Sequence, residues 1–331
     1  MTRGPVPVFA TLAALLVLAV AASLSLGAEP IPLGRLLAAG VGGGTGIDRL
    51  ILVQIRLPRA LLGLSVGASL GLAGAALQGL MRNPLIEPGL IGVSGGASLG
   101  AVLAFYGGAA LLSPAAVPAA GFVGALASTL LLAAVAGRGV RIPVLVLFGV
   151  ALGSLTGALT ALALNLAPSP FAILEIVFWL LGSISDRSLG DVALALPPMA
   201  VGWALLLTAG RGMEALTLGE TAAQSLGIDM RRFTLRVIVG TALAVGPAVA
   251  VAGTIGFVGL VVPHVVRPWV GHRPGPVLWA SALGGAVLLL LADIVVRLAP
   301  TAAELKLGVV TALVGAPYFI ALLMRRERGA A

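Results

Sequence analysis

Ten apolar segments, each about as long as a membrane-spanning helix, divide this chain of 331 residues. A helix that crosses a bilayer needs about 20 mainly apolar residues, and polar residues, Gly or Pro interrupt the chain at about that interval. The segments lie near residues 6–26, 58–80, 87–106, 118–136, 144–166, 192–209, 233–252, 256–270, 277–296 and 307–324. The sequence therefore predicts an all-α polytopic membrane protein with about ten transmembrane helices in a single domain, residues 1–331.

The composition agrees with a membrane bundle and excludes several kinds of site. Apolar residues make up 59% of the chain and charged residues only 10%, whereas soluble domains carry about 25% charged residues. The 46 glycines suit closely packed membrane helices. The chain has no cysteine, which excludes disulfides, thiolate metal sites and cysteine nucleophiles. Its basic residues lie singly between apolar runs, so nucleic-acid binding is not expected.

The distribution of basic residues predicts that both termini are cytoplasmic. Short cytoplasmic loops are enriched in Lys and Arg, and ten spans with both termini inside place 13 of the 20 basic residues inside and 7 outside. The seven residues assigned to the outside are Arg35, Arg49, Arg56, Arg59, Arg187, Arg297 and Lys306.

Two segments allow another topology. Residues 171–181 are apolar but about half as long as a span, so we expect them to lie along the interface or to re-enter the membrane. Counting them as an eleventh span would put the termini on opposite sides. The first apolar segment resembles a cleaved signal peptide, but its length favours a retained span.

A short internal similarity suggests an inverted repeat. Val66-Gly67-Ala68-Ser69-Leu70 in the second segment resembles Val239-Gly240-Thr241-Ala242-Leu243 in the seventh. Because five spans separate them, equivalent helices would run in opposite directions, as in many transporters. The predicted five-helix halves are residues 1–170 and 190–331. The alternative is a chance match in a chain rich in Gly, Ala and Val.

The sequence shows no catalytic, nucleotide-binding or metal-binding pattern. The P-loop motif is absent, and Ser94-Gly95-Gly96, which resembles part of an ATPase signature, lies in an apolar segment where small residues serve helix packing. His264 and His272 are eight residues apart without a carboxylate cluster, which favours a packing role over a metal site. We therefore expect no enzymatic activity, cofactor or metal.

Ionisable residues within the spans are scarce. Asp293 and Arg297 are four residues apart near the outer end of the ninth segment, and this spacing predicts a local ion pair. Carriers coupled to protons or sodium need buried ionisable groups, so this scarcity argues against ion-coupled transport.

The longest polar stretch between spans is residues 210–232. Its centre, from Glu220 to Leu226, has a short helical pattern that Gly227 ends. Since the charge distribution places this stretch in the cytoplasm, it is either an ordinary connection or a surface on which a soluble partner docks.

Several ordered motifs resemble one family. They are Arg56-Leu57-Pro58-Arg59, Gln78 with Arg82-Asn83-Pro84-Leu85, Leu218-Gly219-Glu220, Gly256-Phe257-Val258-Gly259, and Ala292-Asp293-Ile294 with Arg297. From about residue 56 to residue 323 the chain resembles the FecCD-type permease subunits of ABC importers for iron chelates and vitamin B12. The resemblance implies a homodimer in the bacterial inner membrane, two ATPase subunits and a periplasmic solute-binding protein.

The resemblance also assigns roles to residues. It implies that Arg56, Arg59 and Arg297 pair with glutamates of the binding protein, and the planar guanidinium suits such pairing. The alternative is contact with lipid headgroups.

On the cytoplasmic side, the resemblance implies an ATPase-coupling helix within residues 211–232. The residues concerned are Gly219, Glu220, Ala223, Leu226 and Gly227. A second group falls where the family closes the path on the cytoplasmic side, although relatives can carry small hydroxyl residues there. This predicted gate is Arg141, Ile142 and Pro143.

The function expected from the resemblance is transport of an iron chelate, either a ferric siderophore or haem, driven by a separate ATPase. Vitamin B12 is the alternative cargo. An ion-coupled secondary transporter is the less favoured class.

Overall fold

The computed structural model describes residues 5–27, 29–40, 42–43, 45–109, 113, 115–167, 169–301 and 304–328. Every regular element in these ranges is a helix, and the same ranges contain no strand. The prediction of an all-α fold is therefore confirmed.

Seven helical stretches of the described chain are long and apolar enough to cross a membrane. They are α1 (Pro5–Ser25), the continuous rod of α3 (Gly46–Leu50), η1 (Ile51–Arg56) and α4 (Leu57–Met81), α7 (Ala116–Ala136), α8 (Ile142–Asn165), α10 (Leu189–Leu207) with α11 (Gly210–Leu216), α13 (Met230–Ala252), and α15 (Pro274–Leu298). The other helices are α2 (Leu33–Gly40), η2 (Pro88–Ile91), α5 (Val93–Tyr106), α9 (Pro170–Leu180), α12 (Glu220–Ser225), α14 (Val258–Val266) and α16 (Leu307–Arg328).

Three apolar segments form helices that are shorter than a span. Helix α5 has 14 residues and rises about 21 Å, so it falls short of the span predicted at 87–106. Helix α9 has 11 residues, which agrees with the expectation that this segment does not cross. Helix α14 has nine residues and rises about 13.5 Å, less than half of the bilayer core of about 30 Å, so it falls short of the span predicted at 256–270. Phe257 precedes α14 in the left-handed region at φ 67°, which separates this helix from the chain before it.

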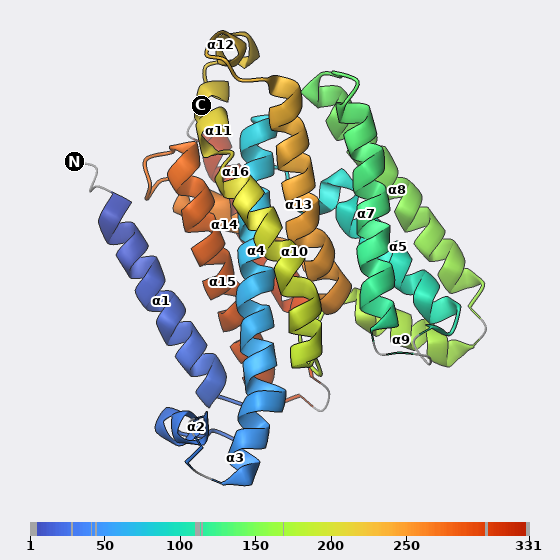
Figure 1. Ribbon diagram of the computed structural model, residues 1–331, viewed down its shortest axis with the longest axis vertical. Helices are drawn as coiled ribbons and strands as arrows, with labels where there is room; N and C mark the ends of the chain where they lie inside the picture. The colour runs from blue at the N-terminus through green and yellow to red at the C-terminus, as the bar shows by residue number, and fades with distance from the viewer. Residues whose placement is uncertain are drawn as a thin grey trace.

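Helix α4 lies at the centre of the bundle and packs against α15, α13, α14 and α10 (Figure 1). Its contact with α15 is backbone to backbone, because a methyl group at Gly67 would overlap the carbonyl group of Gly285, and one at Gly71 would overlap that of Ser281. A methyl group at Gly74 would likewise overlap the backbone of Gly259 in α14. Glycine is therefore required where these helices approach.

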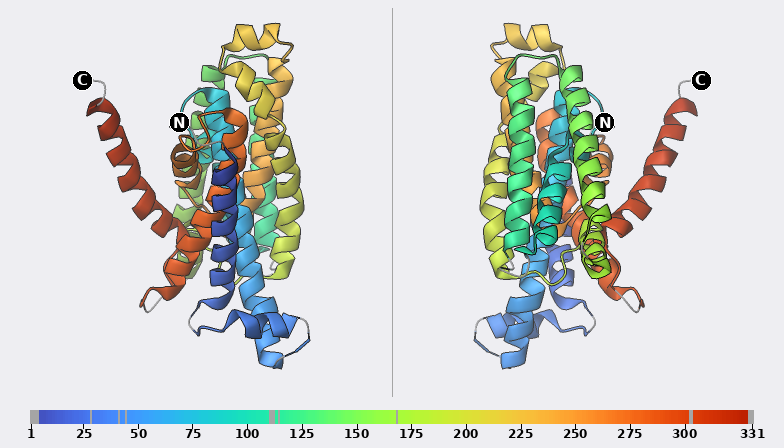
Figure 2. Two further views of the ribbon diagram at one scale, coloured as in Figure 1. Left: turned by 90° about the vertical axis from the view of Figure 1, so that its left-hand side faces the viewer. Right: turned by 90° about the vertical axis from the view of Figure 1, so that its right-hand side faces the viewer.

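The bundle has two distinct ends (Figures 1 and 2). Helix α12 lies at one end, and α1 begins and α16 ends toward that side. Helices α2 and α3 lie at the other end, together with the first turn of α4 and the last turn of α15. Following the sidedness predicted from charge, we call the end with α12 the inner end and the end with α2 and α3 the outer end.

Helix α16 diverges from the rest of the molecule (Figure 2). It contacts α15 and α14 near its start and leaves Leu313 and Val314 largely exposed. The body of the bundle therefore consists of α1 through α15, with α16 projecting beside it.

Candidate docking and coupling surfaces

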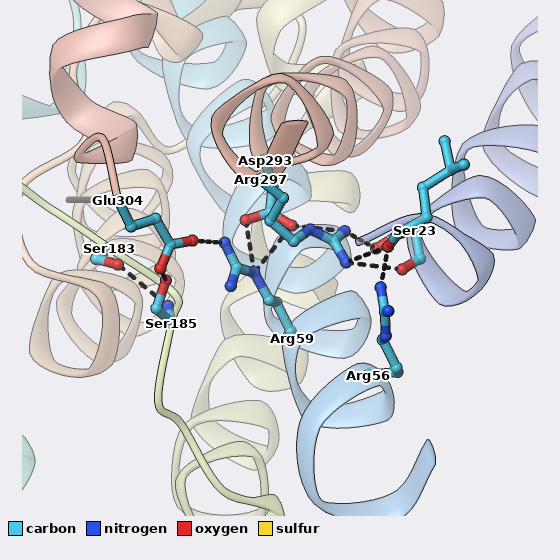
Figure 3. A network of polar contacts seen from close by, with 9 residues as sticks. Ser23, Arg56, Arg59, Ser183, Ser185, Asp293, Arg297 and Glu304 are labelled. Atoms are coloured by element: carbon cyan, nitrogen blue, oxygen red, sulfur yellow. Dashed lines mark hydrogen bonds and ion pairs between the residues drawn. The ribbon is translucent and has the colours of Figure 1, made fainter. Parts of the chain in front are cut away.

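A buried ion-pair network joins α4 and α15 at the outer end (Figure 3). The carboxylate of Asp293, whose side chain is 1% exposed, accepts from Arg59 Nε at 2.9 Å and pairs with Arg297 Nη2 at 2.8 Å. Arg59 lies in the first turn of α4, and Asp293 and Arg297 lie one turn apart in α15. The predicted Asp293–Arg297 pair is therefore confirmed, and Arg59 is a second partner that the spacing did not indicate.

Glu304 extends this network to two loops. Its carboxylate pairs with Arg59 Nη2 and accepts a hydrogen bond of 2.7 Å from the hydroxyl of Ser185 (Figure 3). Burial raises the pKa of Glu304, but the hydrogen bonds from Arg59 and Ser185 and the positive charges of Arg59 and Lys306 together outweigh burial, so the pKa lies below its ordinary value. Glu304 thereby ties the segment before α16 to the loop before α10.

The other two arginines hold the end of α1. Arg297 donates to the carbonyl oxygens of Ser23 at 2.9 Å and Leu26 at 3.0 Å, and to the Ser23 hydroxyl at 2.8 Å. Arg56 donates to the carbonyl oxygens of Leu26 and Glu29. The last carbonyls of a helix lack partners within the helix and attract cations. These arginines therefore fasten α1 to α4 and α15.

A pocket of about 440 Å³ opens between these groups and contains all three predicted docking arginines. Its lining includes Arg56, Arg59, Arg297, Glu29 and Glu304. The structure thus brings the three arginines together at the outer end, as their sequence assignment required. They are mostly buried, however, since Arg56 exposes 6% of its surface and the side chains of Arg59 and Arg297 expose 12% and 8%.

We call this cluster the arginine pocket. Nearby carboxylates neutralise most of its positive charge. The cluster has three guanidiniums and two carboxylates, Asp293 and Glu304, which pair with Arg59 and Arg297. This leaves one positive charge in excess before Glu29 is counted. A guanidinium has five N–H donors, so an arginine that already holds one carboxylate can donate to a second.

The inner end carries the predicted coupling helix. Helix α12 begins after Gly219, at φ 105°, and ends before Gly227, at φ 85°, so the predicted short helix and its glycine stop are confirmed. Ala223 is fully buried within the chain itself, which means that it anchors α12 and is not part of the exposed face.

The exposed face of this helical tip presents two leucines. Leu218 is 70% exposed and Leu226 is 62% exposed, with Glu220 exposed between them. Leu226 was among the predicted coupling residues, whereas Leu218 was not. Its position in the Leu218-Gly219-Glu220 motif was the signal that could have identified it.

The residues of the predicted gate lie where α8 begins. Arg141 caps α8 with an extended backbone, and Pro143 occupies the first turn, where a proline is tolerated. Ile142 packs partly against the core, while Arg141 and Pro143 are exposed. A role in closing the path stays a prediction.

Gln78 of α4 is a buried polar residue to which the sequence analysis gave no role. Its side-chain NH₂ group lies within 3.3 to 3.4 Å of the carbonyl oxygens of Ile86, Gly259 and Leu260, and its amide oxygen accepts from Arg267 Nη2 at 2.8 Å. Gln78 therefore satisfies backbone groups where α14 starts. In the described part of the chain, no group of three or more His, Asp or Glu residues is arranged to hold a metal ion.

Comparisons with known proteins agree with this architecture. The chain is 42% identical over 296 residues to the vitamin B12 import system permease protein BtuC of Vibrio cholerae, covering 89% of this chain and 88% of BtuC. It is 38% identical over 299 residues to the uncharacterised ABC transporter permease YvrB of Bacillus subtilis, covering 88% and 84%.

A solved structure has the same fold. It is an inward-facing conformation of a transporter assigned to the metal-chelate type of ABC transporters, with a TM-score of 0.84 and 30% sequence identity, and it covers 97% of this chain and 99% of that one. The model of the FecCD transport family matches residues 15–325. The chain therefore belongs to the FecCD transport family of ABC importer permeases.

Proposed function

We propose that this chain is the permease subunit of an ABC importer for vitamin B12. The observation that carries the proposal is the identity of 40 to 42% to permeases named for vitamin B12 or cobalamin import, which extends over 84 to 96% of this chain. The cargo favoured by the sequence analysis, an iron chelate, becomes the second candidate. The similarity to the metal-chelate type transporter, at 30% identity, supports this second candidate.

The arrangement of the two ends supports a docking role at each. At the outer end, the arginine pocket offers guanidinium donors that would receive glutamate side chains of a periplasmic solute-binding protein. At the inner end, α12 with Leu218 and Leu226 would seat in a groove of an ATPase subunit. The permease itself would change no bond, and ATP hydrolysis would take place on that separate subunit.

A homodimer follows from the same proposal. Helix α16 projects from the bundle and leaves apolar side chains such as Leu313 and Val314 exposed, and a second copy would cover this side. Two permeases in the bacterial inner membrane would then enclose the cargo path. Two ATPase subunits would bind at the inner end and one binding protein at the outer end.

The contacts within the bundle give a route between the two docking surfaces. Helix α12 contacts α11 and α13, α13 packs on α4, and α4 carries Arg59 in its first turn. Closure of the ATPase dimer on ATP would move α12 and tilt these helices, so that the path opens alternately to either side. The gate at Arg141, Ile142 and Pro143 would close the path at the inner end.

The state of Asp293 favours ATP over an ion gradient as the energy source. A carboxylate that carries a proton or sodium ion across the membrane has to be free to bind and release it. Asp293 is instead ion-paired to both Arg59 and Arg297. We therefore assign it a structural role.

Reconstitution tests this proposal. The permease, its ATPase subunit and the solute-binding proteins of the same organism are purified, and the transporter is placed in liposomes. We expect cobalamin with one of those binding proteins to stimulate ATP hydrolysis. We also expect uptake of labelled cobalamin to stop without ATP and to continue with an uncoupler.

Two outcomes would contradict the proposal in different ways. Stimulation by a ferric siderophore or haem, with no response to cobalamin, would establish the second candidate. Uptake that runs without ATP on an imposed pH gradient, and is lost in Asp293→Asn, would assign the chain to the ion-coupled carriers.

A further inference from the structure

A second pocket lies at the outer end beside the arginine pocket. Its volume is about 660 Å³, and its polar lining residues are Gln54, Arg59, Asp186, Arg187 and Ser188. The two pockets share Ile55 and Arg59. The two pockets at the outer end therefore adjoin each other at Ile55 and Arg59.

Arg187 is the unusual residue of this second pocket. Its Nε is buried and has no hydrogen-bond partner among the described residues, and the ion pairs of those residues do not include Arg187. Arg59 differs, because it already holds two carboxylates. Buried polar groups in native proteins nearly always have a partner, and no described residue forms a hydrogen bond or ion pair with Arg187. Arg187 lines the pocket, so the terminal nitrogens of its guanidinium, rather than the buried Nε, are the donors that an acceptor from outside the chain would use.

The acids around Arg187 do not fill this role. The carboxylate of Asp191 accepts from the backbone N–H and the hydroxyl of Ser188, each at 2.8 Å, as the capping box of α10. Asp186 is the neighbouring residue, but its backbone is in the left-handed region at φ 56° and it forms no ion pair with Arg187. Burial lowers the pKa of Arg187. The negative charges of Asp191 and Asp186 raise it in part, so both acids favour the charged guanidinium from a distance.

We propose that the second pocket receives an acidic side chain of the solute-binding protein, whose carboxylate Arg187 binds. The proposal rests on the proposed function, because it extends the docking surface of that same partner. A carboxylate matches the planar donors of a guanidinium. The pocket adjoins the arginine pocket at Ile55 and Arg59, so one docked protein would reach both.

Arg187 offers such a partner a different kind of contact from that of the arginine pocket. A glutamate that approaches Arg59 competes with Asp293 and Glu304, which already hold it. A glutamate that approaches Arg187 meets a donor with no existing bond to break. Arg187 should therefore contribute to affinity at least as much as each arginine of the first pocket.

The test uses the solute-binding protein that stimulates ATP hydrolysis in the reconstitution. Its affinity for the complete transporter in nanodiscs is measured by biolayer interferometry for wild type, Arg187→Glu and Arg187→Lys. Arg49→Glu is the matched control, because Arg49 is an exposed arginine of α3 at the same end that lines neither pocket. The thermal unfolding midpoint of each variant checks folding.

We expect Arg187→Glu to raise the Kd at least about tenfold, since charge reversal places like charges together. Arg187→Lys should have a smaller effect and Arg49→Glu less than about a threefold effect. Unchanged affinity of Arg187→Glu, or an equal loss in Arg49→Glu, would overturn the role of Arg187 and leave the proposed function intact. If Arg187→Glu is unstable, Arg187→Lys with wild-type affinity and wild-type salt dependence would overturn it. Absence of any stimulating binding protein would instead overturn both proposals.

Discussion

The outer and inner ends of this permease present opposite kinds of surface. At the outer end, Arg59 and Arg297 are buried in a network with Asp293 and Glu304, and the groups that we propose for recognition are charged. At the inner end, the tip around α12 exposes two leucines. Charge complementarity accelerates association and suits a partner that binds and leaves, whereas apolar seating suits a permanent partner. We propose on this ground that the partner at the outer end is transient and the partner at the inner end is stable.

The largest effect should come from removing the central acid of the outer network. Asp293→Ala leaves the buried guanidiniums of Arg59 and Arg297 facing each other without their shared carboxylate. We expect a loss of about 3 to 5 kcal/mol in the free energy of unfolding, measured by denaturant unfolding in detergent.

The exposed pair of Asp229 and Arg232 at the inner end provides the control for that change. Asp229→Ala removes an acid that pairs with an arginine three residues later, where Asp293 pairs with one four residues later, but in solvent. Because Asp229 is also the N-cap of α13, the change should cost about 1 to 2 kcal/mol. Equal costs at the two sites would contradict the description of the outer network as a buried, stabilising one.

Association of the ATPase at the inner end should depend on the two exposed leucines. Leu218→Glu with Leu226→Glu places two charges where we propose that the ATPase seats, and we expect association of the ATPase to weaken by about 2 kcal/mol or more. The measurement is the amount of ATPase that copurifies with the permease. Leu218→Met with Leu226→Met keeps the apolar volume and should copurify normally. Wild-type copurification by the double glutamate variant would place the coupling contact elsewhere.

The salt concentration should affect binding at the outer end much more than binding at the inner end. Raising the NaCl concentration from about 0.05 M to 0.5 M shortens the range of charge interactions. The Kd of the binding protein should therefore rise about tenfold. Association of the ATPase should change much less. Equal sensitivity of both partners in the same titration would remove the distinction between a charged and an apolar surface.

The smallest effect should be a pH dependence at Glu304. Its pKa is below the ordinary value in the folded chain, so its stabilising contribution is complete above the unfolded pKa of about 4.3. It is lost as the pH falls through the folded pKa. Unfolding of wild type and Glu304→Gln should differ by about 1 kcal/mol or less at pH 7. The two should converge as the pH falls through the folded pKa of Glu304. A difference that grows on acidification would contradict this assignment.

Local features of the fold could be predicted from the sequence. The i to i+4 spacing of Asp293 and Arg297 indicated their ion pair, and Gly227 indicated where α12 stops. In each case the interacting groups lie within one or two helical turns, so the helical repeat decides the geometry.

Longer-range features could not be predicted in this way. Arg59 and Asp293 are 234 positions apart, and their contact depends on how α4 packs on α15. The apolar run at 256–270 predicted a span by its length alone. The chain forms a shorter helix there because Phe257 adopts a positive φ and its N–H bonds to Glu87. The family resemblance drew attention to Arg56, Arg59 and Arg297 but gave no indication of Arg187, whose unpaired Nε is visible only in three dimensions.

The glycine contacts between α4 and α15 have a mechanical consequence. The backbones of α4 and α15 touch at Gly67, Gly71 and Gly285, with no flexible side chains between them. We therefore expect the two helices to move together as one rigid body. Each of the two helices has 25 residues and extends about 37 Å. The ion pair of Arg59 with Asp293 joins them at the outer tip. We expect a displacement of that tip to be transmitted along both helices toward the inner end. Spin labels on α4 and α15 should keep a constant separation through the transport cycle.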